Sequence, residues 1–183
     1  MYRIGIIGHG PEHFADVEST RRTVRDTIDL LRHHYGTDND EKLIFNVAGN
    51  IGVGQWAAEK CLEDGDRYHL FLPFQPEIVA EHWYNEQQQA LFEHYKYARG
   101  LSICSPKPPV SSEEYDIQCG YSYEDLADAS NFIVAFWVGK KQGKVYNAIK
   151  YAQINSQKLV LDGLNELKLI FIKESSDGRG SST

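Results

Sequence analysis

The chain has 183 residues, with 19 Lys and Arg against 26 Asp and Glu, which gives a formal net charge of −7. This length fits one domain whose core needs no disulfide bonds to hold it. The acidic balance argues against a protein that mainly coats DNA or RNA, because such binding depends on a basic surface. It leaves room for a small local phosphate site. A hydrophobic fraction of 42% is typical of a globular chain.

The cysteines indicate a cytoplasmic protein. Cys61, Cys104 and Cys119 are an odd number without metal-ligand spacing, so we expect no disulfide framework and a reducing compartment. The histidines form no metal-ligand set either, so we expect no structural metal. No stretch approaches the roughly 20 apolar residues of a membrane span. The first residues, MYRIGIIG, form too short an apolar run for a signal peptide. We also expect no cofactor.

In the first half of the chain, strands and helices are predicted to alternate. Asp16 is a candidate N-cap for a helix that ends at Gly36. A second helix is expected from Gln55, and a long one over 83–98. Short β-branched or aromatic runs predict strands at 4–7, 43–47, 68–72 and 101–104.

In the second half, residues 105–121 hold three prolines and no periodicity, and we expect a long loop that acts as a lid. Seven apolar residues at 132–138 predict a strand buried on both faces. A helix is expected from Val145, with further strands at 159–161 and, less clearly, 167–172. The predicted domain is residues 1–173, followed by a disordered tail over 174–183.

The alternation of strands and helices predicts an α/β fold with a mostly parallel sheet and helices on both faces. In such sheets, ligands bind beyond the carboxyl ends of the strands. The loops to examine are therefore 8–13, 49–55, 73–77 and 139–144.

The loop after the second strand, GNIGVG, is the sharpest motif. Its glycines could let backbone amides and a helix N-terminus cradle a phosphate, or they could simply form a tight turn with close packing. The order G-x-x-G-x-G differs from the dinucleotide fingerprint, and no Walker lysine follows. The candidate ligand-binding residues here are Gly49, Asn50, Gly52, Val53, Gly54 and Gln55.

The other loops supply further candidates for ligand binding: Gly8, His9, Gly10, Pro73, Phe74, Gly139, Gly143, Lys144 and Asn147. His9 is either a hydrogen-bond donor to a ligand or a structural residue. The lysines at 140, 141 and 144 are either solvated or face an anion. Tyr121 and Tyr123 are either stacking partners for a base or part of the core.

Several carboxylates could act in acid/base catalysis, although no spacing singles out a pair. Glu59 lies one turn into the helix after the glycine loop, and Asp125 precedes the buried strand. These two residues are the catalytic candidates.

The order of these motifs resembles the YpsA branch of the SLOG superfamily, a Rossmann-like group that includes DprA and the Lonely Guy (LOG) proteins. "IIGHGP" is similar to its "TGHRP"-type opening, and "VAGNIGVGQWAAEKCLE" to its "GMALGVDQWAAE" segment. "LFLPFQPE" with Trp83 is similar to its "PF…Q…W" segment, and residues 125–153 resemble its last unit. The resemblance implies a Rossmann-like three-layer domain that binds nucleotides at these loops, with Glu59 matching the acid of "WAAE".

Two departures bear on catalysis. The branch's Asp in "GVDQW" is Gly54 here, and the position nearest the LOG catalytic glutamate is Asn147, whose amide cannot act as a base. We therefore expect a binding protein, a sensor or a sequestering protein, for a nucleoside phosphate, a cyclic nucleotide or an ADP-ribose-like molecule. The alternative is an enzyme that cleaves or transfers at an N-glycosidic bond of a nucleotide, as a phosphoribohydrolase or a deoxyribosyltransferase does. A homodimer remains open, and we expect no membrane partner.

Overall fold

A computed structural model describes residues 1–36 and 43–165 of the chain. The predicted strand at 167–172 and the predicted tail lie outside these residues. The strands are β1 (Tyr2–Gly8), β2 (Leu43–Ala48), β3 (Tyr68–Leu72), β4 (Gly100–Ile103), β5 (Phe132–Phe136) and β6 (Val160–Asp162). The helices are a 3-10 turn η1 (Pro11–His13), α1 (Val17–Tyr35), α2 (Val53–Asp64), α3 (Pro76–Val79), α4 (Asn85–Tyr97), α5 (Ser112–Asp128) and α6 (Lys144–Ile154).

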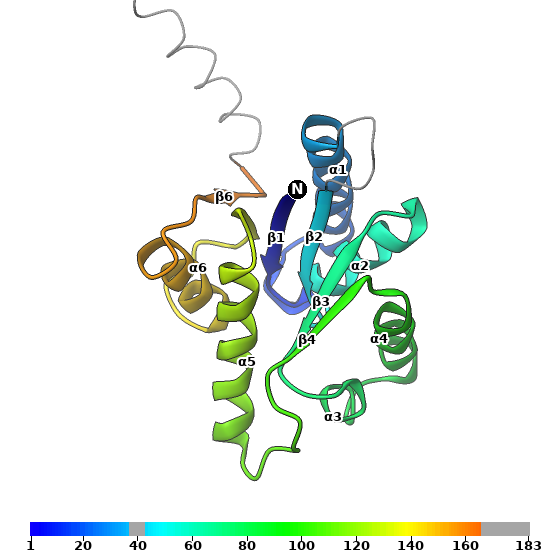
Figure 1. Cartoon of the computed structure of the whole chain (residues 1–183), viewed down its shortest axis with the longest axis vertical. Coiled ribbons are helices and arrows are strands. Elements are labelled where there is room, and N and C mark those ends of the chain that lie inside the picture. The colour runs from blue at the N-terminus through cyan, green and yellow to red at the C-terminus, as the bar shows by residue number, and fades with distance from the viewer. Residues whose placement is uncertain (37–42, 166–183) are drawn as a thin grey trace, which may run out of the picture.

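The six strands form one parallel sheet in the order β4-β3-β2-β1-β5-β6. The predicted α/β class with helices on both faces is confirmed: α1, α2 and α4 cover one face, and α5 and α6 cover the other (Figure 1). The chain moves outward from β1 to β4 and then returns to place β5 beside β1. The topological switch point therefore lies between β1 and β5.

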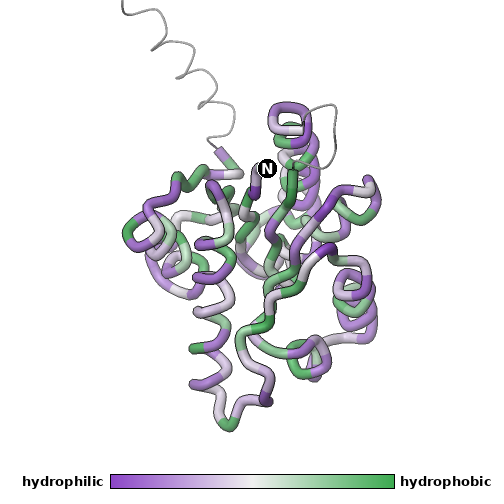
Figure 2. The backbone as a smooth tube through the Cα atoms, viewed as in Figure 1, coloured by the Kyte–Doolittle hydropathy of each residue, from purple (hydrophilic) through white to green (hydrophobic). Residues whose placement is uncertain are grey.

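Local sequence explains the first helix. The Asp16 side chain accepts the Ser19 N–H at 2.9 Å, as its prediction as an N-cap requires. Val24, Ile28 and Leu31 recur at helical spacing and are fully buried against the sheet. Figure 2 shows the consequence, with hydrophobic residues along the central strands and hydrophilic ones on the outer helices.

Ion pairs connect α1 to α2 along the outer surface. Arg21 binds Glu59 with Nη2–O distances of 2.8 and 2.6 Å, Arg25 pairs with Glu63, and Arg32 bonds Asp66 through Nε at 2.9 Å. The carboxylates raise the pKa of Arg32, chiefly through the Asp66 hydrogen bond. These contacts fix α2, and with it the loop that precedes α2.

The prediction of a long, lid-like loop over 105–121 is wrong, because the helix α5 begins at Ser112. Ser111 caps this helix by accepting the Glu114 N–H at 3.1 Å, while the Glu114 carboxylate accepts the Val110 N–H at 2.7 Å. The pattern S-x-x-E before a helix is a capping-box signal that could have revealed it. The predicted helix over 83–98 is confirmed as α4, and the short helix α3, which was not predicted, lies before it in the chain.

Candidate functional site

The backbone of His9, which follows β1, links the last residue of β5 to the first residue of α2. Its N–H donates to the carbonyl of Phe136 at 3.4 Å, and its carbonyl accepts the N–H of Val53 at 3.3 Å. The ring is only 7% exposed, and Nε2 has no hydrogen-bond partner among the described residues. Burial, followed by the charge of His13, lowers the pKa of His9. His9 is therefore a neutral residue at the switch point that joins three loops.

The glycine loop is packed too closely for side chains. A Cβ at Gly54 would lie 2.1 Å from the carbonyl oxygen of Ala48, and one at Gly49 would lie 2.2 Å from Leu72 Cδ2. Gly52 has φ +94° and caps α2. Val53 N–H is bonded to His9, and Gln55 N–H is bonded to the Asn50 carbonyl at 3.0 Å. Close packing thus accounts for these glycines, and two amides at the start of α2 already have partners.

The loop before α6 has different glycines. Gly139 and Gly143 have φ +81° and +90°, and a Cβ added at either would meet no atom within 4 Å, so backbone conformation rather than crowding favours glycine there. The indole N–H of Trp137 donates to the Lys140 carbonyl at 3.0 Å. This open turn leads directly into Lys144, the first residue of α6.

A hollow of about 170 Å³ lies at the carboxyl edge of β2 and β3, beneath α5. Four predicted ligand-binding residues from three loops line it: Gly49, Asn50, Pro73 and Lys144. The remaining lining residues are Ala48, Phe71, Val79, Trp83, Tyr115, Cys119, Ser122 and Tyr123. The hollow thus combines aromatic walls with one lysine and one amide.

Some polar atoms of this hollow have hydrogen-bond partners in the protein and others do not. Asn50 Nδ2 donates to the Ile51 carbonyl at 3.1 Å, whereas its buried Oδ1 has no partner within the described residues. Lys144 Nζ lies 2.6 Å from Asp116 Oδ1 and 5.8 Å from the centre of the Tyr115 ring. Burial raises the pKa of Tyr115 to about 12 and also raises that of Cys119, which the charge of Lys144 partly opposes. Both side chains are therefore protonated near neutral pH.

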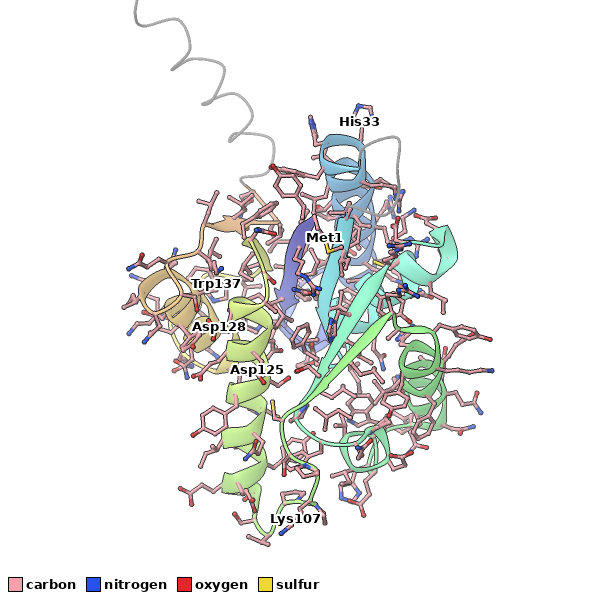
Figure 3. All side chains as sticks on the ribbon, viewed as in Figure 1. Met1, His33, Lys107, Asp125, Asp128 and Trp137 are labelled. Atoms are coloured by element: carbon pink, nitrogen blue, oxygen red, sulfur yellow. The ribbon has the colours of Figure 1, made fainter. Side chains whose placement is uncertain are left out.

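A larger groove of about 780 Å³ adjoins the hollow and shares Val79, Trp83 and Tyr115 with it. Its outer side is formed by Pro108–Ser112, and its other side by α3 and the residues that follow α3. Figure 3 marks Lys107, which precedes this segment in the connection between β4 and α5. Ligand pockets in proteins usually measure about 300–1,000 Å³, so the hollow with its groove reaches that range.

Sequence reasoning missed the contribution of α5. Tyr115, Cys119, Ser122 and Tyr123 follow the i, i+4, i+7, i+8 spacing of one helix face, which the expectation of a loop concealed. Phe74, a predicted site residue, is fully buried and stacks on Tyr115 with ring centres 5.3 Å apart. It supports the wall of the hollow rather than lining it. Tyr123 is buried, whereas Tyr121 is 51% exposed.

The two catalytic candidates lie apart from the hollow and from each other. Glu59 lies on α2 with Arg21, on one side of the sheet. Asp125 is an exposed residue of α5 on the opposite side, where its Oδ2 accepts the Cys104 thiol at 3.3 Å (Figure 3). Asp125 and burial raise the pKa of Cys104 to about 12, burial contributing most. The structure does not bring these carboxylates together.

The other predicted residues surround the hollow without lining it. Gly8, Gly10 and the start of α2 lie on the His9 side, Asn147 is exposed on α6, and Gln55 lines a separate groove on the α2 face. No group of three or more His, Cys, Asp or Glu in residues 1–36 and 43–165 is placed to hold a metal ion. No helix in the described part of the chain is long and apolar enough to cross a membrane.

No protein-family model and no curated protein matches the sequence. Solved structures do match the fold. DprA from Streptococcus pneumoniae has a TM-score of 0.63 at 12% identity over 95% of this chain, which spans only 56% of that protein. A DprA from Helicobacter pylori, described for its single-stranded DNA binding mode, has a TM-score of 0.56 at 14% identity. The match covers 97% of this chain and 81% of that protein.

A protein named TM1055 has a TM-score of 0.53 at 13% identity, and the match covers 87% of this chain and 72% of TM1055. At such identities these likenesses establish the Rossmann-like fold alone. They are consistent with the resemblance to the SLOG superfamily, whereas the YpsA branch is not confirmed.

Proposed function

We propose that this protein binds a nucleotide or a nucleotide-derived small molecule in the hollow beneath α5. The observation that carries the proposal is the convergence of Gly49, Asn50, Pro73 and Lys144, from three loops, on one hollow with aromatic walls. Ligands of parallel α/β sheets bind at this edge. In the proposed complex, Lys144 contacts the phosphate, and a base lies against Tyr115 and Trp83.

Binding without turnover is the version that the geometry supports best. The alternative, cleavage or transfer at an N-glycosidic bond, needs a carboxylate at the ligand. Glu59 is held by Arg21 on the other face of the sheet, and Asp125 is exposed and does not line the hollow. Asn147 at the start of α6 offers an amide, which cannot act as a base.

A small ligand is favoured over a long nucleic acid. The net charge of −7 disfavours binding of a chain of phosphates. Lys144, at the N-terminus of α6, instead suits a ligand with one or two phosphate groups. The single-stranded DNA described for the Helicobacter pylori neighbour is therefore the comparison that the binding experiment should include.

Isothermal titration calorimetry with AMP, cyclic AMP, ADP-ribose and unphosphorylated adenosine tests the proposal. We expect saturable binding of at least one phosphorylated ligand, weakened about tenfold in Lys144→Gln, because a charge-assisted hydrogen bond is lost. Lys141→Gln, an exposed lysine of the same loop, is the matched control and should leave binding unchanged. No saturable heat with any of these ligands refutes the proposal.

Two further measurements separate the alternatives. An oligothymidine should bind the wild-type protein more weakly than the best mononucleotide, and the reverse order would favour a nucleic-acid protein. Chromatography after prolonged incubation should recover the nucleotide intact. Release of free base that is lost in Glu59→Gln would instead support the enzymatic alternative.

A further inference from the structure

A second groove, of about 560 Å³, lies on the opposite side of the sheet from α5, between α1, α2 and α4. Its apolar lining residues include Val17, Ile51, Trp56, Leu62 and Ala90. None of the contacts that form the nucleotide hollow involve it. The function proposed above therefore leaves this groove unexplained.

The rim of the groove is acidic. Four glutamates line it, Glu59 and Glu63 on α2 and Glu86 and Glu93 on α4, against one arginine, Arg21, an excess of three negative charges. Arg21 and Arg25 engage the two glutamates of α2. Glu86 and Glu93 have no ion pair among the described residues, and both are exposed.

The base of the groove adds polar atoms that lack partners. His94 is only 4% exposed and lines the groove, yet its ring has no hydrogen bond within the described part of the chain. The buried Oε1 of Gln87, another lining residue, is likewise unpartnered there. Burial lowers the pKa of His94 against the opposing charges of Glu59 and Glu93, so the ring is neutral and retains an acceptor nitrogen.

These groups are mainly hydrogen-bond acceptors, so the complementary ligand is a donor with positive charge and apolar segments. Glu86 and Glu93 are seven residues apart, on the same face of α4 and about 10 Å apart along its axis. Glu59 and Glu63 are separated by one turn, about 6 Å, on α2. Carboxylates spaced along an apolar channel match ammonium groups separated by short methylene segments, and Trp56 can contact both.

We propose that this groove binds a linear aliphatic polyamine, with its ammonium groups on Glu86 and Glu93, its methylene chain on the apolar base, and an N–H donated toward His94. A compact cation such as Mg²⁺ does not suit the site, because its acceptors are spread along the groove rather than clustered. This proposal is independent of the nucleotide site, since the two sites share no lining residue.

The test is calorimetric titration of the full chain with spermidine, in parallel with tryptophan fluorescence. We expect saturable binding that weakens about tenfold in the Glu86→Gln/Glu93→Gln variant, since two charge contacts are lost. Glu113→Gln/Glu124→Gln removes the same charge from α5 and should bind as the wild type does. Equal weakening in both variants would show general attraction to an acidic surface and would overturn the proposal.

Three controls locate the ligand and define its class. Trp56→Phe should abolish the fluorescence change, and a change that persists through Trp83 or Trp137 would place spermidine elsewhere and refute the site. Mg²⁺ at matched ionic strength should compete poorly, whereas full competition would reduce the effect to screening. Binding of a lysine-rich peptide without any binding of spermidine would also overturn the proposal, in favour of a protein partner.

Discussion

The ammonium group of Lys144, at the start of α6, lies 2.6 Å from the carboxylate of Asp116 on α5. This ion pair bridges the two helices that cover one face of the sheet, at the mouth of the proposed nucleotide hollow. Asp116 thus pairs with the same ammonium group that a phosphate would need to contact. Both side chains are largely exposed, so the pair is weak and can exchange for a ligand.

Asp116→Asn should therefore strengthen binding of a phosphorylated ligand by about two- to fivefold, because the competing charge is removed. Binding of unphosphorylated adenosine should not change. Calorimetric dissociation constants for both ligands measure the effect, and Glu113→Gln on the same helix is the control for net charge. Weaker binding of the phosphorylated ligand in Asp116→Asn would contradict the role given to Lys144.

Gly54 and Gly120 both lie in helices, but only Gly54 is crowded by neighbouring atoms, so alanine substitutions at the two positions can be compared for stability. A Cβ at Gly54 meets the backbone carbonyl of Ala48 at 2.1 Å, whereas one at Gly120 meets nothing within 4 Å. Gly54→Ala should lower the free energy of unfolding by about 1–3 kcal/mol, since α2 must move from β2. Gly120→Ala should raise it by about 0.5–1 kcal/mol through helix propensity.

Urea denaturation of the two glycine variants gives the comparison. A Gly54→Ala variant as stable as the wild type would mean that the glycine loop does not need its close packing. The loop's amides would then have room to move toward a ligand.

Ser111→Ala removes the N-cap of α5 and should cost about 1 kcal/mol of stability. Because the first turns of α5 carry Tyr115, the same change should also weaken nucleotide binding by loosening one wall of the hollow. Asp16→Ala removes the equivalent cap of α1, away from the hollow, and should cost similar stability without affecting binding. Equal binding losses in the two variants would indicate a general effect of destabilisation.

Acid should destabilise the fold through its buried histidines. Burial lowers the pKa of His9, His69 and His94 below the ordinary value of 6.5, so the unfolded chain binds more protons as the pH falls. The stability that these neutral histidines contribute is complete above about pH 7. It is lost progressively as the pH falls below 6.5 toward the lowered pKa values of the folded state. The free energy of unfolding, from urea titrations at pH 7.5 and 5.5, should therefore be smaller at pH 5.5.

His94→Gln should reduce this pH dependence, since the substituted amide does not titrate, even if overall stability falls. The control is His82→Gln, which replaces an exposed histidine and leaves the three buried ones in place. An unchanged slope in His94→Gln would show that His94 takes up no additional proton on unfolding.

Local patterns in the sequence determined most of the elements. The β3 strand coincides with the predicted 68–72 run, Asp16 acts as the predicted N-cap, and the buried run from Phe132 forms the strand β5. These features depend on neighbours a few residues away, through hydrogen bonds at helix ends and through side-chain periodicity. The class of the fold followed because strands alternating with helices favour parallel pairing.

Only the tertiary structure decided which of these elements face each other. Glu59 and Asp125 were equally plausible acids in the sequence, but the crossover connections place α2 and α5 on opposite faces of the sheet. The same packing brings Tyr115 to Lys144 and to the ring of Phe74. Such contacts join residues about thirty to forty positions apart, and periodicity gives no information about them. The charge of −7 therefore argued against a polyanion coat, while the packing of α5 against α6 determined where Lys144, the lysine of the proposed phosphate contact, lies.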